Sequence, residues 1–258
     1  MFLDDVVDKC HNNLLKVSSK VPLAYLVSRG ISLNDIKRYK LGYLEKSFDN
    51  IKEDDFDSKN FNKFLGGRGY FVRERLVFPI TDELGNIKGI ETRALDKRAA
   101  ESLLPKYQEA FKDQISKLQD SSVRYKKFYL EKSKHSAFFF GLPQNLESIW
   151  KEKTVFLTEG IFDMISLGKI KPNCLSSLTA NINEYQIAWF KRYVDRVIVL
   201  FDMDKKGRDS IDKLKEVLGD DCLVYSINLK GHDVNETVVK NGVKELELII
   251  NEKMLNFF

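Results

Sequence analysis

A regular alternation of short apolar runs and amphipathic segments after Trp150 constrains the fold of this chain more than any other feature of its sequence. Apolar runs of four or five residues are typical of β-strands that are buried on both faces, and segments with helical spacing separate them. Strands that alternate with helices in this way predict a parallel sheet with helices on both faces, so we expect residues 151–258 to form an α/β domain. The expected strands are 155–158, 174–178, 197–201 and 223–227, and the expected helices are 161–169, 184–193 and 208–218.

The pattern differs in residues 1–150, where we expect a smaller α+β subdomain. Apolar residues have helical spacing from Phe2 to about Tyr43, and Ser32 can cap a helix there with Asp35 in its first turn. Further along, two runs with strand character flank a segment rich in turn residues, which predicts a hairpin. The hairpin strands are expected at 75–80 and 87–93, a loop at 47–60 and a helical segment at 99–119.

Composition limits what the chain can be without deciding its function. The 258 residues include 42 Lys and Arg against 38 Asp and Glu, a net charge of +4 that neither requires nor excludes a nucleic-acid partner. Cys10, Cys174 and Cys222 form no Cys-x-x-Cys pair, and Cys10-His11 has no second pair to complete a tetrahedral site, so we predict no zinc. No apolar run reaches the roughly 20 residues of a membrane span, and we expect a cytoplasmic protein without a membrane partner.

Acidic residues directly follow two of the predicted strands. Glu159 follows the first strand, with Asp163 four residues on, and Asp202 and Asp204 follow the third. Because ligands of open α/β sheets bind beyond the carboxyl ends of the strands, we expect these acids to meet in one crevice. Carboxylates gathered there repel one another unless a divalent cation compensates them, and such oxygen ligands suit Mg²⁺ or Mn²⁺. The alternative is that they are solvated acids in ordinary loops, which a lone Asp-x-Asp does not exclude.

The acids lie in segments that resemble known motifs. Thr158-Glu-Gly-Ile-Phe-Asp163 and Leu200-Phe-Asp-Met-Asp-Lys-Lys-Gly-Arg-Asp209 are similar to the two signatures of the Toprim domain, which DnaG-type primases, topoisomerases, OLD-family nucleases and RecR share. Residues 230–237 resemble the primase segment in which two acids close the metal site, with Asn235 in place of the second acid. The resemblance implies Glu159, Asp202, Asp204 and Asp233 as metal ligands, and adds Asp163 to the catalytic acids as a support of the site.

The likeness to DnaG-type primases extends upstream of the Toprim signatures. Residues 25–43 are similar to the helical opening of the primase core, 73–95 to the hairpin that follows it, and Phe140-Gly-Leu142 to a short motif before the Toprim domain. The segment 99–123 is an insertion relative to that pattern. Topoisomerases and OLD nucleases lack this front half, so the resemblance favours a stand-alone, phage- or bacterial-type primase core.

Basic residues accompany aromatic ones just before the Toprim signatures. Residues 123–134 carry five basic and three aromatic side chains, a composition that suits phosphates and unpaired bases, or alternatively a charged surface loop. The primase resemblance implies an Arg, a second Arg and a Lys that face nucleic acid or nucleotide, and the Lys falls on either Lys127 or Lys106. His135 and His232 border these segments and are expected to be structural or surface residues. The predicted nucleic-acid and nucleotide contacts are Arg29, Arg75, Arg93, Lys106, Lys127, Lys205 and Arg208.

The resemblance implies Mg²⁺-dependent synthesis of RNA primers, with single-stranded DNA and NTPs as substrates. DnaG-type enzymes usually carry a zinc module and a helical bundle or helicase as well, so we expect a separate replicative helicase as a partner. Two other classes remain open: a Toprim nuclease that cuts DNA with the same acids, and a RecR-like scaffold that binds DNA or a replication partner without catalysis.

Overall fold

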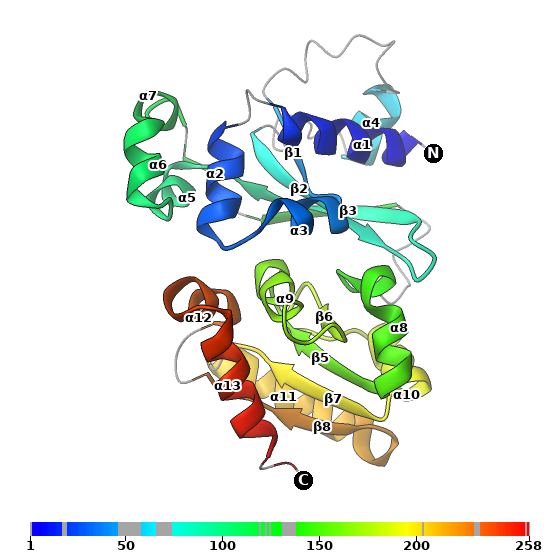
Figure 1. The fold of residues 1–258 in the computed structure, drawn as a ribbon. Coiled ribbons are helices and arrows are strands. Elements are labelled where there is room, and N and C mark those ends of the chain that lie inside the picture. Colours follow the sequence, from blue (N-terminus) through cyan, green and yellow to red (C-terminus); the bar gives the residue numbers. More distant parts are fainter. Residues whose placement is uncertain are drawn as a thin grey trace. The chain divides into compact units, whose positions relative to one another are not determined.

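The computed structural model describes residues 2–16, 20–45, 58–65, 74–118, 120–121, 123, 125–130, 138–202, 204–229, 233–255 and 257 (Figure 1). The chain divides into two compact units, Met1–Ile80 with Ile87–Lys134, and Thr81–Asn86 with His135–Phe258. The functional division at residue 150 is a different boundary and stays a prediction. His135 and His232 lie outside the described residues.

The second unit contains a four-stranded parallel sheet, as the alternation of apolar runs predicts. Its strand order is β6-β5-β7-β8, so the first strand in the chain pairs with both the second and the third. The strands are β5 (Thr154–Thr158), β6 (Cys174–Ser176), β7 (Arg196–Leu200) and β8 (Leu223–Ser226).

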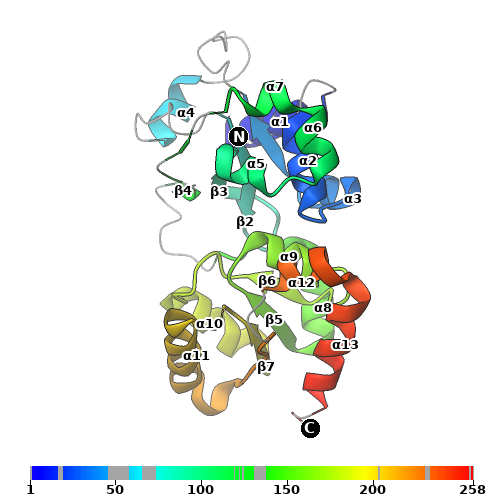
Figure 2. The same cartoon turned by 90° about the vertical axis from the view of Figure 1, so that its left-hand side faces the viewer.

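Helices cover both faces of this sheet, which confirms the predicted α/β architecture. In Figure 2, α10 (Glu184–Tyr193) and α11 (Lys205–Leu218) lie on one side of the strands, and α9 (Ile161–Leu167), α12 (Val234–Asn241) and α13 (Val243–Met254) lie on the other. The helix α8 (Leu142–Glu152) precedes β5. Helix α11 begins three residues earlier than predicted, because Asp204 caps it.

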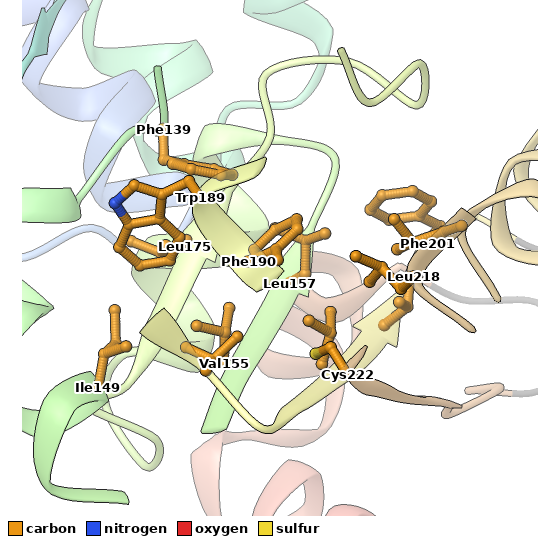
Figure 3. Close-up of a cluster of buried hydrophobic side chains, with 14 of the residues drawn as sticks. Phe139, Ile149, Val155, Leu157, Leu175, Trp189, Phe190, Phe201, Leu218 and Cys222 are labelled. Carbon is orange, nitrogen blue, oxygen red and sulfur yellow. The ribbon is translucent and has the colours of Figure 1, made fainter. Parts of the chain in front are cut away.

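One core cluster of the second unit joins the sheet to α8, α10 and α11 (Figure 3). Alternate residues of β5 and β7 point to the same face of the sheet, so Val155 and Leu157 enter the cluster together. Phe139 packs against two aromatic residues of α10, with ring centroids 5.2 Å from Trp189 and 5.1 Å from Phe190. Leu218, at the end of α11, is fully buried in the same cluster.

The first unit contains a four-stranded sheet of order β1-β2-β3-β4. The predicted hairpin is present, and the Asp82 carboxylate holds its turn by accepting hydrogen bonds from the backbone N–H groups of Leu84 and Asn86. The capping box of Ser32 and Asp35 is also present. The basic and aromatic segment forms β4, a strand that the sequence pattern had not indicated. The strands are β1 (Gly42–Leu44), β2 (Arg75–Thr81), β3 (Ile87–Ala94) and β4 (Tyr125–Tyr129).

Helices of the first unit pack on this sheet through an apolar cluster of their own. Leu3, Val6, Val7 and Cys10 of α1 contact it, and α1 approaches so closely that a Cβ on Gly42 would lie 2.6 Å from the Cys10 Cβ. The predicted helical segment at 99–119 contains three short helices in its described part. The helices are α1 (Phe2–Leu15), α2 (Lys20–Ser28), α3 (Leu33–Arg38), α4 (Ser58–Phe64), α5 (Lys97–Glu101), α6 (Pro105–Ala110) and α7 (Lys112–Ile115).

Two features bear on the expected absence of zinc and of a membrane span. Cys10 is buried in the apolar cluster of α1, and this burial raises the pKa of its thiol to about 12. Within the described ranges, no helix is long and apolar enough to cross a membrane.

The core of the second unit can be tested with two leucines that differ in burial. Leu218→Ala should destabilise this unit by about 2–5 kcal/mol, because it removes fully buried atoms and leaves a cavity. Leu248→Ala, the same change at a residue of α13 that is 65% exposed, should stay within about 0.5 kcal/mol. Urea unfolding followed by tryptophan fluorescence measures both, since Trp150 and Trp189 lie in the second unit. Equal losses would contradict the assigned core.

Candidate functional site

The sheet register brings the predicted acids of the second unit to one edge. Strands β5 and β7 pair in parallel with Thr158 opposite Leu200. Glu159 therefore follows one strand end directly, and Asp202 follows the neighbouring strand end after a single intervening residue, Phe201. Because both strands run in the same direction, these acids leave the sheet at its carboxyl edge, where α/β folds bind ligands.

A cavity of about 430 Å³ opens beside this edge. Its acidic lining consists of Asp202 and Asp204 after β7, and of Asp233 and Glu236 at the start of α12. Glu159 and Asp163 do not line it. Glu236 is not among the residues predicted from the sequence, although an acid three residues after a helix cap is a recognisable signal.

The pKa of the Asp202 carboxyl group depends on the other acids of this cluster. Asp202 is exposed as a residue, but partial burial of its carboxyl group raises its pKa above the ordinary value of 3.8, and the negative charges of Asp233, Glu159 and Asp204 raise it further. Each of the other three predicted ligands therefore lies close enough to Asp202 for its charge to raise the pKa of that carboxyl group. A bound cation would reverse the sign of this interaction.

The chemistry of these donors fits a divalent cation with hard character. Four carboxylates offer oxygen ligands only, which Mg²⁺ and Mn²⁺ prefer. In the part of the chain that the structure describes, no three His, Cys, Asp or Glu side chains are placed to ligate a single ion. Mg²⁺ held by one or two of these carboxylates, with water in its other positions, would fit this arrangement.

Two of the acids are fixed as helix caps. One oxygen of Asp204 accepts a hydrogen bond from the Gly207 N–H at 2.7 Å at the start of α11, and one oxygen of Asp233 accepts from the Glu236 N–H at the start of α12. Each carboxylate has further lone pairs for a cation. The caps thus hold both side chains beside the cavity.

Glycines allow the backbone to approach the acids closely. A Cβ on Gly207 would overlap the carbonyl oxygen of Asp202, so the first turn of α11 can lie against that residue only with glycine there. A Cβ on Gly160 would lie 2.5 Å from an oxygen of Asp163. These contacts explain the glycines in the Glu-Gly and Lys-Lys-Gly-Arg segments.

Asp163 links two helices instead of lining the cavity. Its carboxylate accepts a hydrogen bond of 2.9 Å from the backbone N–H of Asn235, and the Asn235 amide donates to the Ser166 hydroxyl at 2.8 Å. Asn235, which replaces the second acid of the resembled segment, is fully buried against α9. These bonds join α9 to α12 and so position Asp233, two residues before Asn235.

The end of β6 also supports Glu159. The Ser176 hydroxyl donates to the Glu159 carbonyl at 2.8 Å, and the Ser177 hydroxyl donates to the Thr158 carbonyl at 3.1 Å. Small polar residues at this strand end thus hold the backbone on either side of the first acid. On the other side of the acids, Lys205 and Arg208 are exposed in the first turn of α11.

In the first unit, two of the predicted basic residues lie on the same face of the sheet. Arg93 lies on the sheet with its guanidinium carbon 5.2 Å from the ring centroid of Tyr25 and 5.1 Å from that of Tyr125. Lys127 forms an ion pair with Glu91, its partner across the sheet, with 3.5 Å between Nζ and Oε2. Arg93 and Lys127 therefore belong to one surface of β3 and β4.

Arg75 occupies a structural position. It is 2% exposed, and its guanidinium donates to the Thr92 hydroxyl at 2.9 Å and to the Val123 carbonyl at 2.8 Å. Burial lowers the pKa of Arg75 to about 10, although Asp96 acts in the opposite direction. These bonds favour a role in tying the sheet to the segment before β4, in place of the nucleic-acid contact that the sequence predicts.

The remaining two candidates lie elsewhere in the first unit. Arg29 follows α2, where its backbone N–H closes the helix on the Tyr25 and Leu26 carbonyls, and its residue is partly buried. Lys106 is exposed on the short helix α6, with Nζ 4.9 Å from the ring centroid of Tyr107. Lys106 is therefore not part of the sheet surface that carries Lys127.

Two known protein families match this chain, one in its first half and one in its second half, in the order that the resembled motifs predict. Residues 10–117 match the family described as DNA primase catalytic core, N-terminal domain, and residues 156–238 match the family described as Toprim-like.

Similar proteins and structures agree with these matches. A DNA primase of Borreliella burgdorferi is 27% identical over 91% of this chain, and one of Aquifex aeolicus is 28% identical over 96%. The matched regions are 44% and 48% of those relatives, so the chain spans less than half of their length. The zinc-binding and RNA polymerase domains of the Aquifex aeolicus primase share the fold, with a TM-score of 0.75 at 24% identity over 97% of this chain and 60% of that one. A DnaG catalytic core has a TM-score of 0.74 at 19% identity over 97% of this chain and 78% of that one.

The close approach of Gly207 to the Asp202 carbonyl predicts that an alanine at this position lowers the stability of the second unit. Helix propensity alone favours Gly207→Ala by about 1 kcal/mol, but the overlap with the Asp202 carbonyl should destabilise the second unit by about 1–3 kcal/mol. Lys206→Ala, at the exposed preceding position, should stay within about 0.5 kcal/mol. Urea unfolding followed by tryptophan fluorescence distinguishes these results. A stabilised Gly207→Ala variant would show that α11 does not begin against Asp202.

Proposed function

Because this chain has the catalytic core of a DnaG-type primase, with a core N-terminal domain followed by a Toprim-like domain, we propose that it synthesises RNA primers on single-stranded DNA. The observation that carries the proposal is the electrostatic cluster of Asp202, Asp233, Glu159 and Asp204 at the carboxyl edge of β5 and β7. Four acids in mutual repulsion are poorly suited to binding nucleic acid by themselves. They are well suited to hold the cation that nucleotidyl transfer requires.

Each acid has a separate task in this proposal. Glu159, Asp202 and Asp204 would hold Mg²⁺ or Mn²⁺, and Asp233, which lines the same cavity as Asp202 and Asp204, would be a further ligand. The bound cation supplies positive charge that orients the triphosphate and stabilises charge at the α-phosphate while a 3′-hydroxyl attacks. Asp163 keeps α12 in place through the Asn235 backbone.

The basic residues would bind the phosphates of the NTP and the DNA strand. Lys205 and Arg208 are exposed beside the acids and can contact the phosphates of an NTP. On the first unit, Lys127 shares a sheet face with the exposed Tyr125, whose ring the buried Arg93 contacts, and a basic residue beside an exposed ring suits single-stranded DNA. This shared surface favours Lys127 over Lys106 as the contact to the template. Arg29 is a further candidate for the nucleic-acid strand.

The proposal implies partners and a setting. Single-stranded DNA and NTPs are its substrates, a separate replicative helicase is the partner that would deliver the strand, and the cytoplasm of a bacterium or of an infected host is the setting. Tethering to a helicase on the same strand would raise the effective concentration of template at the enzyme.

A single incubation separates primer synthesis from its two rivals. The protein is incubated with single-stranded DNA, labelled NTPs and Mg²⁺, and the products are resolved on a denaturing gel. We expect labelled primers. DNA fragments would indicate a Toprim nuclease, and the absence of both products with retained DNA binding would indicate a scaffold.

Removal of a single acid should abolish most primer synthesis. Asp202→Asn and Glu159→Gln should each lower the rate by a factor on the order of 10³ or more, because the loss of one charged ligand weakens both cation binding and transition-state stabilisation. The rate of primer synthesis at saturating NTP is the measurement. Asp212→Asn, the same change at an exposed position further along α11, is the matched control and should keep the wild-type rate.

The fold of these variants should survive, because each removes one of several mutually repelling charges. In a thermal melt, Mg²⁺ should stabilise the wild type and the Asp212→Asn control, and stabilise Asp202→Asn less. A rate above about a tenth of wild type in either site variant, a cost below roughly 1.4 kcal/mol, would mean that the acids are wrongly assigned.

The choice between Lys127 and Lys106 can be made by the salt dependence of DNA binding. Lys127→Ala should reduce the slope of log K against log salt by about 0.7, the amount expected for one phosphate contact to a single strand. Lys106→Ala should leave the slope unchanged. Since Lys127→Ala leaves the buried Glu91 without its ion pair, the double variant Lys127→Met with Glu91→Gln should also be measured. A reduced slope for Lys106→Ala alone would reverse the assignment.

A further inference from the structure

The pairing of β3 with β4 arranges charged and aromatic residues on one face of the sheet. Arg93 lies opposite Tyr125, and Glu91 lies opposite Lys127. Since side chains two residues apart point to the same side of a strand, all four share a face. Tyr125 and Lys127 are therefore neighbours along β4, about 7 Å apart at the usual rise of a strand.

The three aromatic residues of β4 differ in what they contact. Phe128 is 8% exposed and belongs to the apolar cluster of the first unit, with its ring 6.0 Å from that of Phe64. Tyr129 is partly buried, and burial raises the pKa of its hydroxyl to about 12. Tyr125, by contrast, is 46% exposed. Among the aromatic residues of this strand, Tyr125 has the surface on which a planar ligand could stack.

Arg93 contacts the Tyr125 ring. The Arg93 residue is 4% exposed, and its guanidinium carbon lies 5.1 Å from the ring centroid of Tyr125 and 5.2 Å from that of the fully buried Tyr25. Such cation–π contacts fix the position of a ring that would otherwise move freely at the surface. A ring held in this way loses little conformational entropy when a ligand binds.

Glu91 holds Lys127 beside the ring. Glu91 is 7% exposed, its carboxylate lies 3.5 Å from the Lys127 ammonium group, and the Lys127 side chain is 28% exposed. Desolvation raises the pKa of Glu91, and the positive charges of Lys127 and Arg93 oppose that shift. A fixed ammonium group next to a fixed aromatic ring can meet the phosphate and the base of one nucleotide.

We propose that Tyr125 is a stacking platform for one unpaired base of the single strand, positioned by Arg93, and that Lys127 beside it contacts the phosphate backbone. This inference rests on the proposed function, because it takes single-stranded DNA as the ligand of this surface. It goes further by assigning a role to Tyr125, and by separating a contact that needs a base from a contact that needs only a phosphate.

The test uses two single strands of equal length, one with all its bases and one with abasic positions throughout its centre. Fluorescence anisotropy measures the affinity of the wild-type chain, Tyr125→Leu and Tyr125→Phe for both. Tyr125→Leu keeps an apolar cover over Arg93 without a stacking face. It should weaken binding of the normal strand by roughly 5-fold to 150-fold, the effect of losing one base–aromatic stack.

Three further results are expected. Tyr125→Leu should bind the abasic strand as well as the wild type does, and its salt slope should be unchanged, because no phosphate contact is lost. Tyr125→Phe should behave as the wild type on both strands. Tyr107→Leu, which changes a tyrosine that also lies beside a lysine in the same unit, is the matched control and should bind both strands normally.

Other outcomes overturn the inference. An equal loss on both strands would mean that Tyr125 only supports Arg93 or Lys127, and no loss on either would mean that it is ordinary surface. A wild-type chain that binds single strands but makes no primers would contradict the proposed function and leave the stacking result standing. Failure of the wild type to bind either strand would refute both.

Discussion

The mutual repulsion of carboxylates at the ends of two adjacent parallel strands is the constraint on which the second unit depends. The register of β5 and β7 brings Glu159 and Asp202 to one edge, and the caps of α11 and α12 add Asp204 and Asp233. Their charges raise the pKa of Asp202, so the arrangement is unfavourable for bare ionised acids. A protein gains from such a cluster when a divalent cation occupies it, which is why we regard the cluster as the centre of the chemistry.

Close contacts and hydrogen bonds around the cluster hold its acids in position. Gly207 lets α11 begin against the Asp202 carbonyl, Ser176 holds the backbone at Glu159, and the bond between Asp163 and the Asn235 N–H fixes α12. In the first unit, contacts between side chains of β3 and β4 position the candidate binding residues instead. There, buried Arg93 contacts the ring of Tyr125 across the sheet, and buried Glu91 forms an ion pair with Lys127 on the same face. In the proposed function, the first unit binds the single strand, and the second holds the cation and the triphosphate.

The sequence predicts those parts of the fold that local spacing determines. The apolar runs locate the strands of the parallel sheet, the segment around Asp82 locates the hairpin, and Ser32 with Asp35 locates a helix start. Spacing carries no information about which strands pair, so the order β6-β5-β7-β8 could not be predicted. The strand β4 was not recognised because its residues do not alternate regularly between buried and exposed. The same reason applies to single residues. Arg75 is a basic residue that could contact nucleic acid, but it is buried and donates a hydrogen bond to the Thr92 hydroxyl. Asn235 donates to the Ser166 hydroxyl of α9. Only the folded chain shows these partners. The individual site assignments therefore remain predictions.

The central claim, a divalent-cation site at the carboxyl edge of β5 and β7, is tested most directly by locating the ion. Crystals of the protein soaked in Mn²⁺ and measured at a wavelength where manganese scatters anomalously would show each bound ion as a peak. The account predicts a peak within coordination distance of carboxylate oxygens of Glu159, Asp202 or Asp204 at the cavity that Asp233 also lines. Peaks only at other positions, from protein that makes primers with Mn²⁺ in solution, would contradict it.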